Sequence, residues 1–229
     1  MSKFTHLHIH SHYSLLEALP KIPELVKRAK SLGMDTLALT DNGNLYGAIE
    51  FYKECLENEI KPIIGVDFYV ASRTRHDKEA RVDTHRSRFV LLAENEQGYK
   101  NLLKLVSASY LEGFYYKPRI DQELLEKYHK GLIAIAKEEK YYREIFGRDN
   151  FFLESDLAIY NVRYLDESDR PAFNTVLSIQ EHLNRGVFDV EEDLHFRGQF
   201  VEEALDVDPV PSALGEECHA RRQAAELTV

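Results

Sequence analysis

The chain has 229 residues, 44% of them hydrophobic, which suits a globular protein with one large α/β domain and a substantial core. Its net charge of −10 argues against strong independent binding to DNA, because phosphate neutralisation supplies most of that affinity. No apolar run approaches the ~20 residues that cross a bilayer, and residues 1–4 carry no signal-peptide core, so we expect a cytoplasmic protein without membrane contact.

Strand-like and helix-like segments alternate along the first half of the chain. Residues 5–10 are predicted as a strand, and residues 22–32 as a helix whose apolar side chains recur at helical spacing and whose end is marked by Gly33. The next predicted elements are a strand at 36–39, a helix at 45–58, strands at 61–70 and 89–93, and a helix that Asn95 caps and that runs to 111.

The second half has weaker signals. The predicted strands are 131–136, 151–153 and 157–161, and the predicted helices are 138–146, 167–183 and 213–227. Residues 206–212 are a candidate linker, or a loop before the last helix. We find no internal repeat and expect a single domain over residues 1–229. Short strands separated by helices favour a parallel sheet, either open or closed into a barrel.

Four histidines alternate over the first predicted strand and its exit, namely His6, His8, His10 and His12. Alternate side chains of an extended chain share one face. A His-x-His pair at the C-terminal end of a strand can supply two imidazole ligands to one divalent metal ion. Strand ends are also where parallel α/β folds assemble their sites. Ordinary polar packing is the alternative interpretation.

Carboxylates recur at comparable places. Glu17 follows the histidines, Asp41 follows the second predicted strand, and Asp67 lies in the third. Histidines and acids together would suit a metal-dependent phosphoesterase, in which the metal lowers the pKa of a bound water. Each acid alone could instead be a turn cap or a solvated charge. Thiolate ligands are not expected, because Cys55 and Cys218 lie in no paired-thiol motif.

Several segments carry a resemblance to a known family. They are HLHIHSHYSLL at 6–16, LALTDNGNLYG at 37–47, IKPIIGVD at 60–67, LLAENEQGYKNL at 91–102, YKPRI at 116–120, NVRYL at 161–165 and VLSIQ at 176–180. In sequence and order they resemble the PHP (polymerase and histidinol phosphatase) domain of bacterial DNA polymerase III alpha subunits. The resemblance is dense over residues 1–136 and patchy over the abbreviated part, 137–229.

The resemblance implies a distorted barrel of about seven parallel strands with helices outside, similar to a TIM barrel. Strand ends bind several metal ions in intact members of the family. Some of these members are phosphoesterases, and some that belong to polymerases act as 3′–5′ exonucleases. In other members the site is degenerate, and the domain supports architecture and binds other polymerase subunits, with a proofreading exonuclease subunit as one candidate partner.

The ligands that the resemblance implies are only partly present. The matching positions are His8, His10, Glu17, Asp41 and Asp67, the last of which replaces a glutamate. Other ligand positions are substituted, by Asn42, Arg88, Asn161 and Arg163. Arginine cannot ligate a cation, because it is permanently protonated and has no acceptor. The segments after Ala136 and around residues 154–156 are also shorter than in the family, by nature or by design.

These substitutions predict a non-catalytic domain in DNA replication that holds no cofactor and does not itself synthesise DNA. The alternative is a metal-dependent phosphoesterase or exonuclease that uses zinc or manganese on a reduced ligand set: His8, His10, Asp41 and Asp67. A stand-alone DNA-binding module is the weakest interpretation, given the acidic charge. The cation-rich stretch 73–88 is expected to be a solvated loop rather than a DNA-binding patch.

Without cations, neighbouring carboxylates would repel one another and their pKa values would rise. We predict that the matching histidines and acids converge at one end of the fold, at strand C-termini. We also predict that Arg88 or Arg163 forms a charge-assisted hydrogen bond there with Asp67, Asp41 or Glu17. The alternative is that both arginines extend into solvent.

Overall fold

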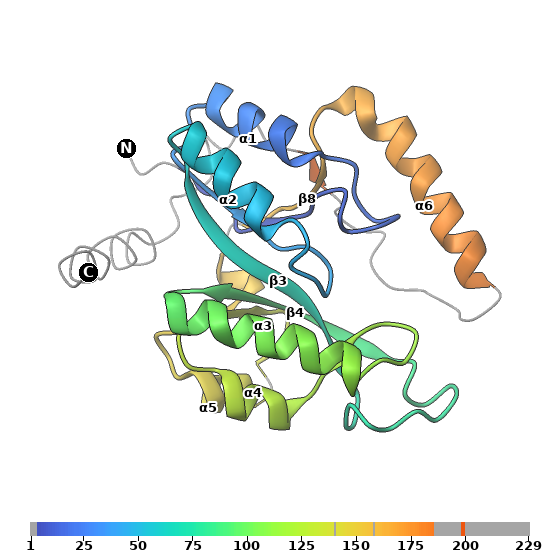
Figure 1. Cartoon of the computed structure of the whole chain (residues 1–229). Coiled ribbons are helices and arrows are strands. Elements are labelled where there is room, and N and C mark those ends of the chain that lie inside the picture. The colour runs from blue at the N-terminus through green and yellow to red at the C-terminus, as the bar shows by residue number, and fades with distance from the viewer. Residues whose placement is uncertain (1–3, 140, 158, 186–197, 200–229) are drawn as a thin grey trace.

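The computed structural model describes residues 4–139, 141–157, 159–185 and 198–199, which form a mixed α/β fold (Figure 1). The strands are β1 (His8–Ile9), β2 (Thr36–Leu39), β3 (Lys61–Ala71), β4 (Arg86–Ala93), β5 (Arg119–Ile120), β6 (Leu132–Ala136), β7 (Phe151–Leu153), β8 (Asn161–Tyr164) and β9 (Gly198–Gln199). The helices are α1 (Ile22–Ser31), α2 (Ala48–Glu57), α3 (Glu96–Leu111), α4 (Gln122–Tyr128), α5 (Tyr142–Phe146) and α6 (Arg170–Arg185). Short 3₁₀ turns lie at Glu154–Asp156 and Glu167–Asp169.

The long strand β3 joins two parts of the fold. Its first half, residues 61–64, pairs in parallel with β2, and its second half, residues 65–71, pairs antiparallel with β4. An isolated bridge joins Asn42 to Asp67 beyond the end of β2, and β5 then pairs with residues 69–70 along the same edge. Figure 1 shows β3 running from the part covered by α1 and α2 to the part covered by α3.

The N-terminal strand β1 connects the smaller sheet to β2. It pairs in parallel with β8, in the register His8↔Asn161, and β9 extends that sheet. Its flanking backbone also accepts hydrogen bonds from the β2 region: Ala38 N donates to His6 O at 3.1 Å, and Thr40 N donates to Ile9 O at 2.8 Å. The exit of β1 therefore lies beside the exit of β2.

The two largest apolar clusters of the described residues lie on either side of this junction. One packs α1 and α2 against β1, β2 and β8, with Ile9, Leu25 and Phe51 fully buried. The other packs α3, α4 and α5 against β3, β4 and β6, with Phe68 and Leu105 fully buried. The helical spacing that predicted the first helix is the spacing of the residues that α1 buries.

The predicted α/β class is confirmed, but the parallel barrel is not found. Strand β4 runs antiparallel to both of its neighbours, β3 and β6. Within the described residues, no strand pairing links β7 to β8 or β9, so the strands form no closed barrel. The connection between β3 and β4, residues 72–85, contains no helix to carry the chain back across the sheet. A parallel neighbour usually needs such a crossover, and without it the chain returns antiparallel.

The stretch 73–88, which holds most of that connection and the start of β4, was expected to be a solvated loop, and this expectation is wrong for part of it. The side chain of Arg75 is 8% exposed and bonds Asp121 through Nη1 at 3.0 Å. Arg119 on β5 is fully buried and holds the loop through hydrogen bonds to its backbone. Its guanidinium donates to four backbone carbonyls, those of Gly113, Asp83, Arg75 and Asp77.

Other expectations have mixed outcomes. Asn95 caps α3 as predicted, its Oδ1 accepting from Gly98 N at 3.1 Å. The strand expected at 157–161 is wrong, because β8 begins at Asn161. Leu157 and Ile159 instead pack against a small apolar cluster, Ala38, Val90, Leu92 and Ile135. Strand β5 and helix α4 were not predicted.

The expected linker at 206–212, the expected helix at 213–227 and Cys218 lie outside the described residues, and the single domain over 1–229 stays a prediction. None of the helices in the described ranges combines the length and apolarity needed to cross a membrane.

Candidate metal centre

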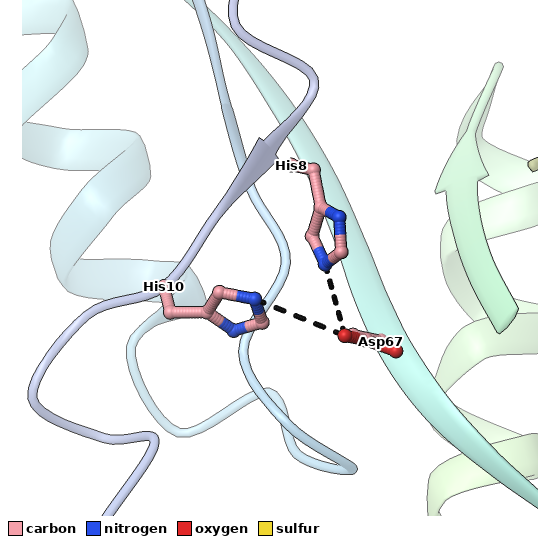
Figure 2. Close-up of side chains that lie close together, drawn as sticks. All are labelled: His8, His10 and Asp67. Carbon is pink, nitrogen blue, oxygen red and sulfur yellow. Dashed lines mark hydrogen bonds and ion pairs between the residues drawn. The ribbon is translucent and has the colours of Figure 1, made fainter. Parts of the chain in front are cut away.

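Three buried side chains from β1, from the residue after it and from β3 meet in the interior: His8, His10 and Asp67 (Figure 2). His8 Nε2 lies 2.9 Å from Asp67 Oδ2, and His10 Nε2 lies 3.8 Å from the same oxygen. One potential ligand atom from each residue lies within 4.8 Å of the other two. The three side chains are at most 7% exposed, so they form a compact donor set closed off from bulk water.

The local backbone explains why these histidines face β3. His8 and His10 are alternate residues of an extended segment, so their side chains leave the same face. The hydroxyl of Thr40 fixes the strand between them, because its Oγ1 accepts from Ile9 N and donates to Ile9 O, each at 3.0 Å. Asp67 lies on β3 just past the end of β2, where the backbone that follows β2 still pairs with it through the bridge to Asn42.

The outer histidines of the run have other environments. His6 packs edge-on against Phe4 and lies beside Tyr160, and burial lowers the pKa of His6 to about 4. The exposed His12 lies against the Tyr13 ring, with 4.2 Å between ring centroids. Of the four alternating histidines, therefore, the two central ones reach Asp67.

Asp41 holds the loop that follows His10 instead of joining the three-residue group. Its Oδ1 accepts from Ser11 N at 2.7 Å and from Ser14 Oγ at 2.6 Å, and its Oδ2 accepts from Ser11 Oγ at 2.8 Å. Burial raises the pKa of Asp41, and the serine hydrogen bonds oppose that rise. All of these bonds go to one turn, so Asp41 positions the turn that begins at Ser11.

Glu17 is the centre of a buried group of charges next to Asp67. Its Oε1 accepts from Lys117 Nζ at 3.0 Å, and its Oε2 accepts from Asn42 Nδ2. Arg88 Nη1 and Arg163 Nη1 each lie 3.6 Å from Oε2. Burial alone would raise the pKa of Glu17, but Arg88, Lys117 and Arg163 outweigh burial and lower that pKa to about 2. Glu17 is therefore a carboxylate held by side-chain cations.

Arg88 joins the two carboxylates. Its Nε donates to Asp67 Oδ1 at 3.1 Å, and its Nη2 donates to Asp67 Oδ2 and to Asn42 Oδ1. Burial alone would raise the pKa of Asp67, but Arg88 and the His8 hydrogen bond hold it well below its ordinary value. The predicted charge-assisted hydrogen bond between an arginine and an acid is thus confirmed for this pair.

Arg163 and Asn161, on β8, complete the surroundings. The side chain of Arg163 is 6% exposed, and its Nη1 donates to Glu17 O at 2.9 Å, so the alternative of two solvent-extended arginines is wrong. Asn161 is the register partner of His8, and its buried Oδ1 has no hydrogen-bond partner within the described residues. An amide oxygen of this kind can serve as a ligand for hard cations.

Some residues of the site were not predicted as site residues. Lys117 is 100 positions from Glu17 in sequence, and only the YKPRI match pointed to that segment. Tyr69, whose hydroxyl donates to Glu17 Oε1 at 3.2 Å, alternates with Asp67 on β3. Ser11 and Ser14 lie within the first motif, yet nothing in their spacing distinguished them from ordinary turn residues.

The chain combines a mixed α/β fold with two histidines and a carboxylate that lie together beside the ends of neighbouring strands. This combination defines a class of proteins with a candidate metal centre whose ligands are nitrogen and oxygen atoms. Residues 6–139, more than half of the chain, match the family model of the PHP domain. The chain belongs to the PHP domain family.

The curated relatives of this chain include DNA polymerase III alpha subunits, and the chain is homologous to their N-terminal region. It is 47% identical over 177 residues to that of Borreliella burgdorferi, covering 67% of this chain and 15% of the relative. It is 35% identical over 254 residues to that of Aquifex aeolicus, covering 86% of this chain and 22% of the relative. It is 37% identical over 231 residues to that of Deinococcus radiodurans, covering 78% of this chain and 17% of the relative. The chain therefore spans less than a quarter of the length of these relatives.

Solved structures overlap this chain only loosely. A putative metal-dependent phosphoesterase from Bifidobacterium adolescentis overlaps 77% of this chain and 84% of its own, with a TM-score of 0.42 and 10% identity. An amidohydrolase from Chromobacterium violaceum overlaps 46% of this chain and 32% of its own, with a TM-score of 0.35 and 23% identity.

Proposed function

We propose that this chain is a non-catalytic PHP domain of a bacterial polymerase III alpha-type protein, acting in DNA replication through architecture and the binding of partner subunits. The observation that carries the proposal is the two-nitrogen contact of Arg88 with Asp67. This guanidinium engages both oxygens of the carboxylate that His8 and His10 face. Arginine supplies positive charge but has no site for a ligand, so it activates no water as a metal ion does.

The charge balance of the site supports the same proposal. Three cationic side chains, Arg88, Lys117 and Arg163, surround two carboxylates, Glu17 and Asp67. A divalent ion would enter a region whose carboxylates are already neutralised. Like unit charges about 4 Å apart repel by about 4 kcal/mol at an effective dielectric constant of about 20, and a divalent ion doubles that energy. Metal binding would therefore require Arg88 to move away from Asp67.

A metal-dependent phosphoesterase or 3′–5′ exonuclease is the second candidate, and one observation favours it. His10 Nε2 is fully buried and has no hydrogen-bond partner within the described residues, as expected for a nitrogen that binds a cation. His8, His10 and Asp67 would hold zinc or manganese through two nitrogens and one oxygen. When bound there, the metal would supply a Lewis acid and a water of lowered pKa.

Metal content and thermal stability decide between the candidates. The chain is purified without chelator and its zinc and manganese are measured. We expect much less than one ion per chain and no change in melting temperature on adding chelator, because a ligand stabilises only the state that it binds. Arg88→His is the matched variant: it removes the guanidinium and adds an imidazole, so its metal content should rise.

Stoichiometric metal in the wild type, with hydrolysis of a model phosphodiester that His8→Ala abolishes, would overturn the non-catalytic proposal. A drop of several degrees on adding chelator, restored by zinc, would contradict it as well. The proposed partner binding is tested separately, by sedimentation of the chain with the other subunits of the polymerase, including its proofreading exonuclease subunit. No complex at micromolar concentrations would remove that part of the proposal.

A further inference from the structure

The ring of His10 has a polar partner on the side away from Asp67. Its Nδ1 lies 3.3 Å from the hydroxyl oxygen of Ser14, four residues later. His10 is fully buried and Ser14 is nearly so, so water does not compete for this contact. The other ring nitrogen, Nε2, faces Asp67 (Figure 2).

The remaining bonds of Ser14 fix the direction of that contact. A serine hydroxyl has one hydrogen to donate and two lone pairs to accept with. Ser14 Oγ lies 2.6 Å from Asp41 Oδ1, and this carboxylate also accepts from Ser11 N and Ser11 Oγ. The single hydrogen of Ser14 therefore points to Asp41. One lone pair of Ser14 accepts from Asn42 N at 3.0 Å, which leaves the other lone pair for His10.

We propose that Ser14 is a positioning residue that fixes the tautomer of His10, with the proton on Nδ1 and a lone pair on Nε2 directed at Asp67. The reverse tautomer would place the Nδ1 lone pair against the lone pair of the hydroxyl. Nε2 lies 3.8 Å from Asp67 Oδ2 and makes no hydrogen bond within the described residues, so no hydrogen bond at Nε2 opposes this assignment. His8, in contrast, approaches the same oxygen to 2.9 Å.

The assignment gives the loop after β1 a specific role. Asp41 holds Ser11 and Ser14, and Ser14 in turn holds the His10 ring so that Nε2 is the nitrogen available inside the site. Partners of this kind typically change metal affinity or activity by about 10- to 100-fold when they are removed. The inference concerns the protein without metal, so it does not depend on which candidate function holds.

Nitrogen-15 NMR of the histidine rings tests the tautomer directly. The chain is labelled with ¹⁵N and kept in chelator at pH 7, and two-bond proton–nitrogen correlations identify which ring nitrogen carries the proton. The His10 signals are assigned by their loss in His10→Gln. We expect protonated Nδ1 in the wild type, a shift toward protonated Nε2 in Ser14→Ala, and the wild-type pattern in Ser14→Thr, which keeps the hydroxyl.

Ser11→Ala is the matched control, because it removes a hydrogen bond to Asp41 without touching His10. The control should leave the His10 pattern unchanged. Protonated Nε2 in the wild type would overturn the assignment, and so would an unchanged pattern in a folded Ser14→Ala or an equal shift in Ser11→Ala. If Ser14→Ala does not fold, the wild-type and Ser14→Thr spectra still decide.

Discussion

The contact between Arg88 and Asp67 predicts a measurable coupling in folding stability. The perturbation is a double-mutant cycle of Arg88→Met and Asp67→Asn. Methionine keeps most of the arginine's apolar stem while removing its charge and donors, and asparagine keeps the shape of aspartate while removing its charge. The free energy of unfolding is measured for the wild type, the two single variants and the double variant.

The magnitude follows from burial and geometry. Unit charges about 4 Å apart attract by about 4 kcal/mol at an effective dielectric constant of about 20. Desolvation offsets part of this attraction, since the Asp67 side chain is 1% exposed and the Arg88 side chain is 26% exposed. Breaking a fully buried pair costs about 3–5 kcal/mol, and partial exposure reduces that cost. We therefore expect losses of about 3 kcal/mol for Arg88→Met and about 2 kcal/mol for Asp67→Asn, with a coupling of about 2 kcal/mol.

Urea denaturation at pH 7 and at low pH is the assay. The folded-state pKa of Asp67 is held well below its ordinary value, so the pair stabilises the fold above the unfolded-state pKa of about 4. This contribution is lost as the pH falls through the folded-state pKa. In Arg88→Met, burial without the guanidinium should raise the Asp67 pKa above its ordinary value. The difference in stability between wild type and variant should therefore shrink as the pH falls from that raised pKa toward the folded-state pKa of the wild type.

Arg86→Met provides the control on the same strand. Arg86 lies over the same Tyr69 ring as Arg88, but its Nη1 donates to Thr84 O. Its cycle with Asp67→Asn should be additive within about 0.5 kcal/mol. Additive losses in the Arg88 cycle, or an equal coupling in the Arg86 cycle, would refute the assignment of Arg88 as the charge partner of Asp67.

Two further predictions concern groups near this pair. Because the pKa of Glu17 is about 2 in the folded protein, Glu17 should contribute about 2–4 kcal/mol above about pH 4.5 and lose that contribution toward pH 2. Glu17→Gln should therefore flatten the acid side of the stability curve in thermal denaturation, and an unchanged slope would contradict this. Arg119→Met leaves several carbonyls without their buried donor, so we expect a loss of about 3 kcal/mol or more and faster proteolysis within residues 72–85. An unchanged cleavage rate would show that Arg119 does not hold this loop.

The sequence alone determined features that depend on neighbouring residues. Apolar spacing predicted α1, a single asparagine predicted the start of α3, and β7 has the predicted bounds. Alternation along an extended segment placed His8 and His10 on one face. The motif order indicated the family, to which residues 6–139 belong. Each of these inferences uses a period or a cap that acts within a few residues.

The tertiary structure decided which residues from distant parts of the sequence lie next to each of these residues. The antiparallel direction of β4, the role of Asp41 in holding Ser11 and Ser14, and the contact of Lys117 with Glu17 were not predicted. The sequence did predict that an arginine would meet an acid, but it left open which arginine and which acid. Those pairings depend on strand register between segments separated by tens of residues, and a one-residue shift in register reverses the face of every side chain. Local periodicity therefore placed donors on the correct face, and only the packed sheet determined which cation neutralises which carboxylate.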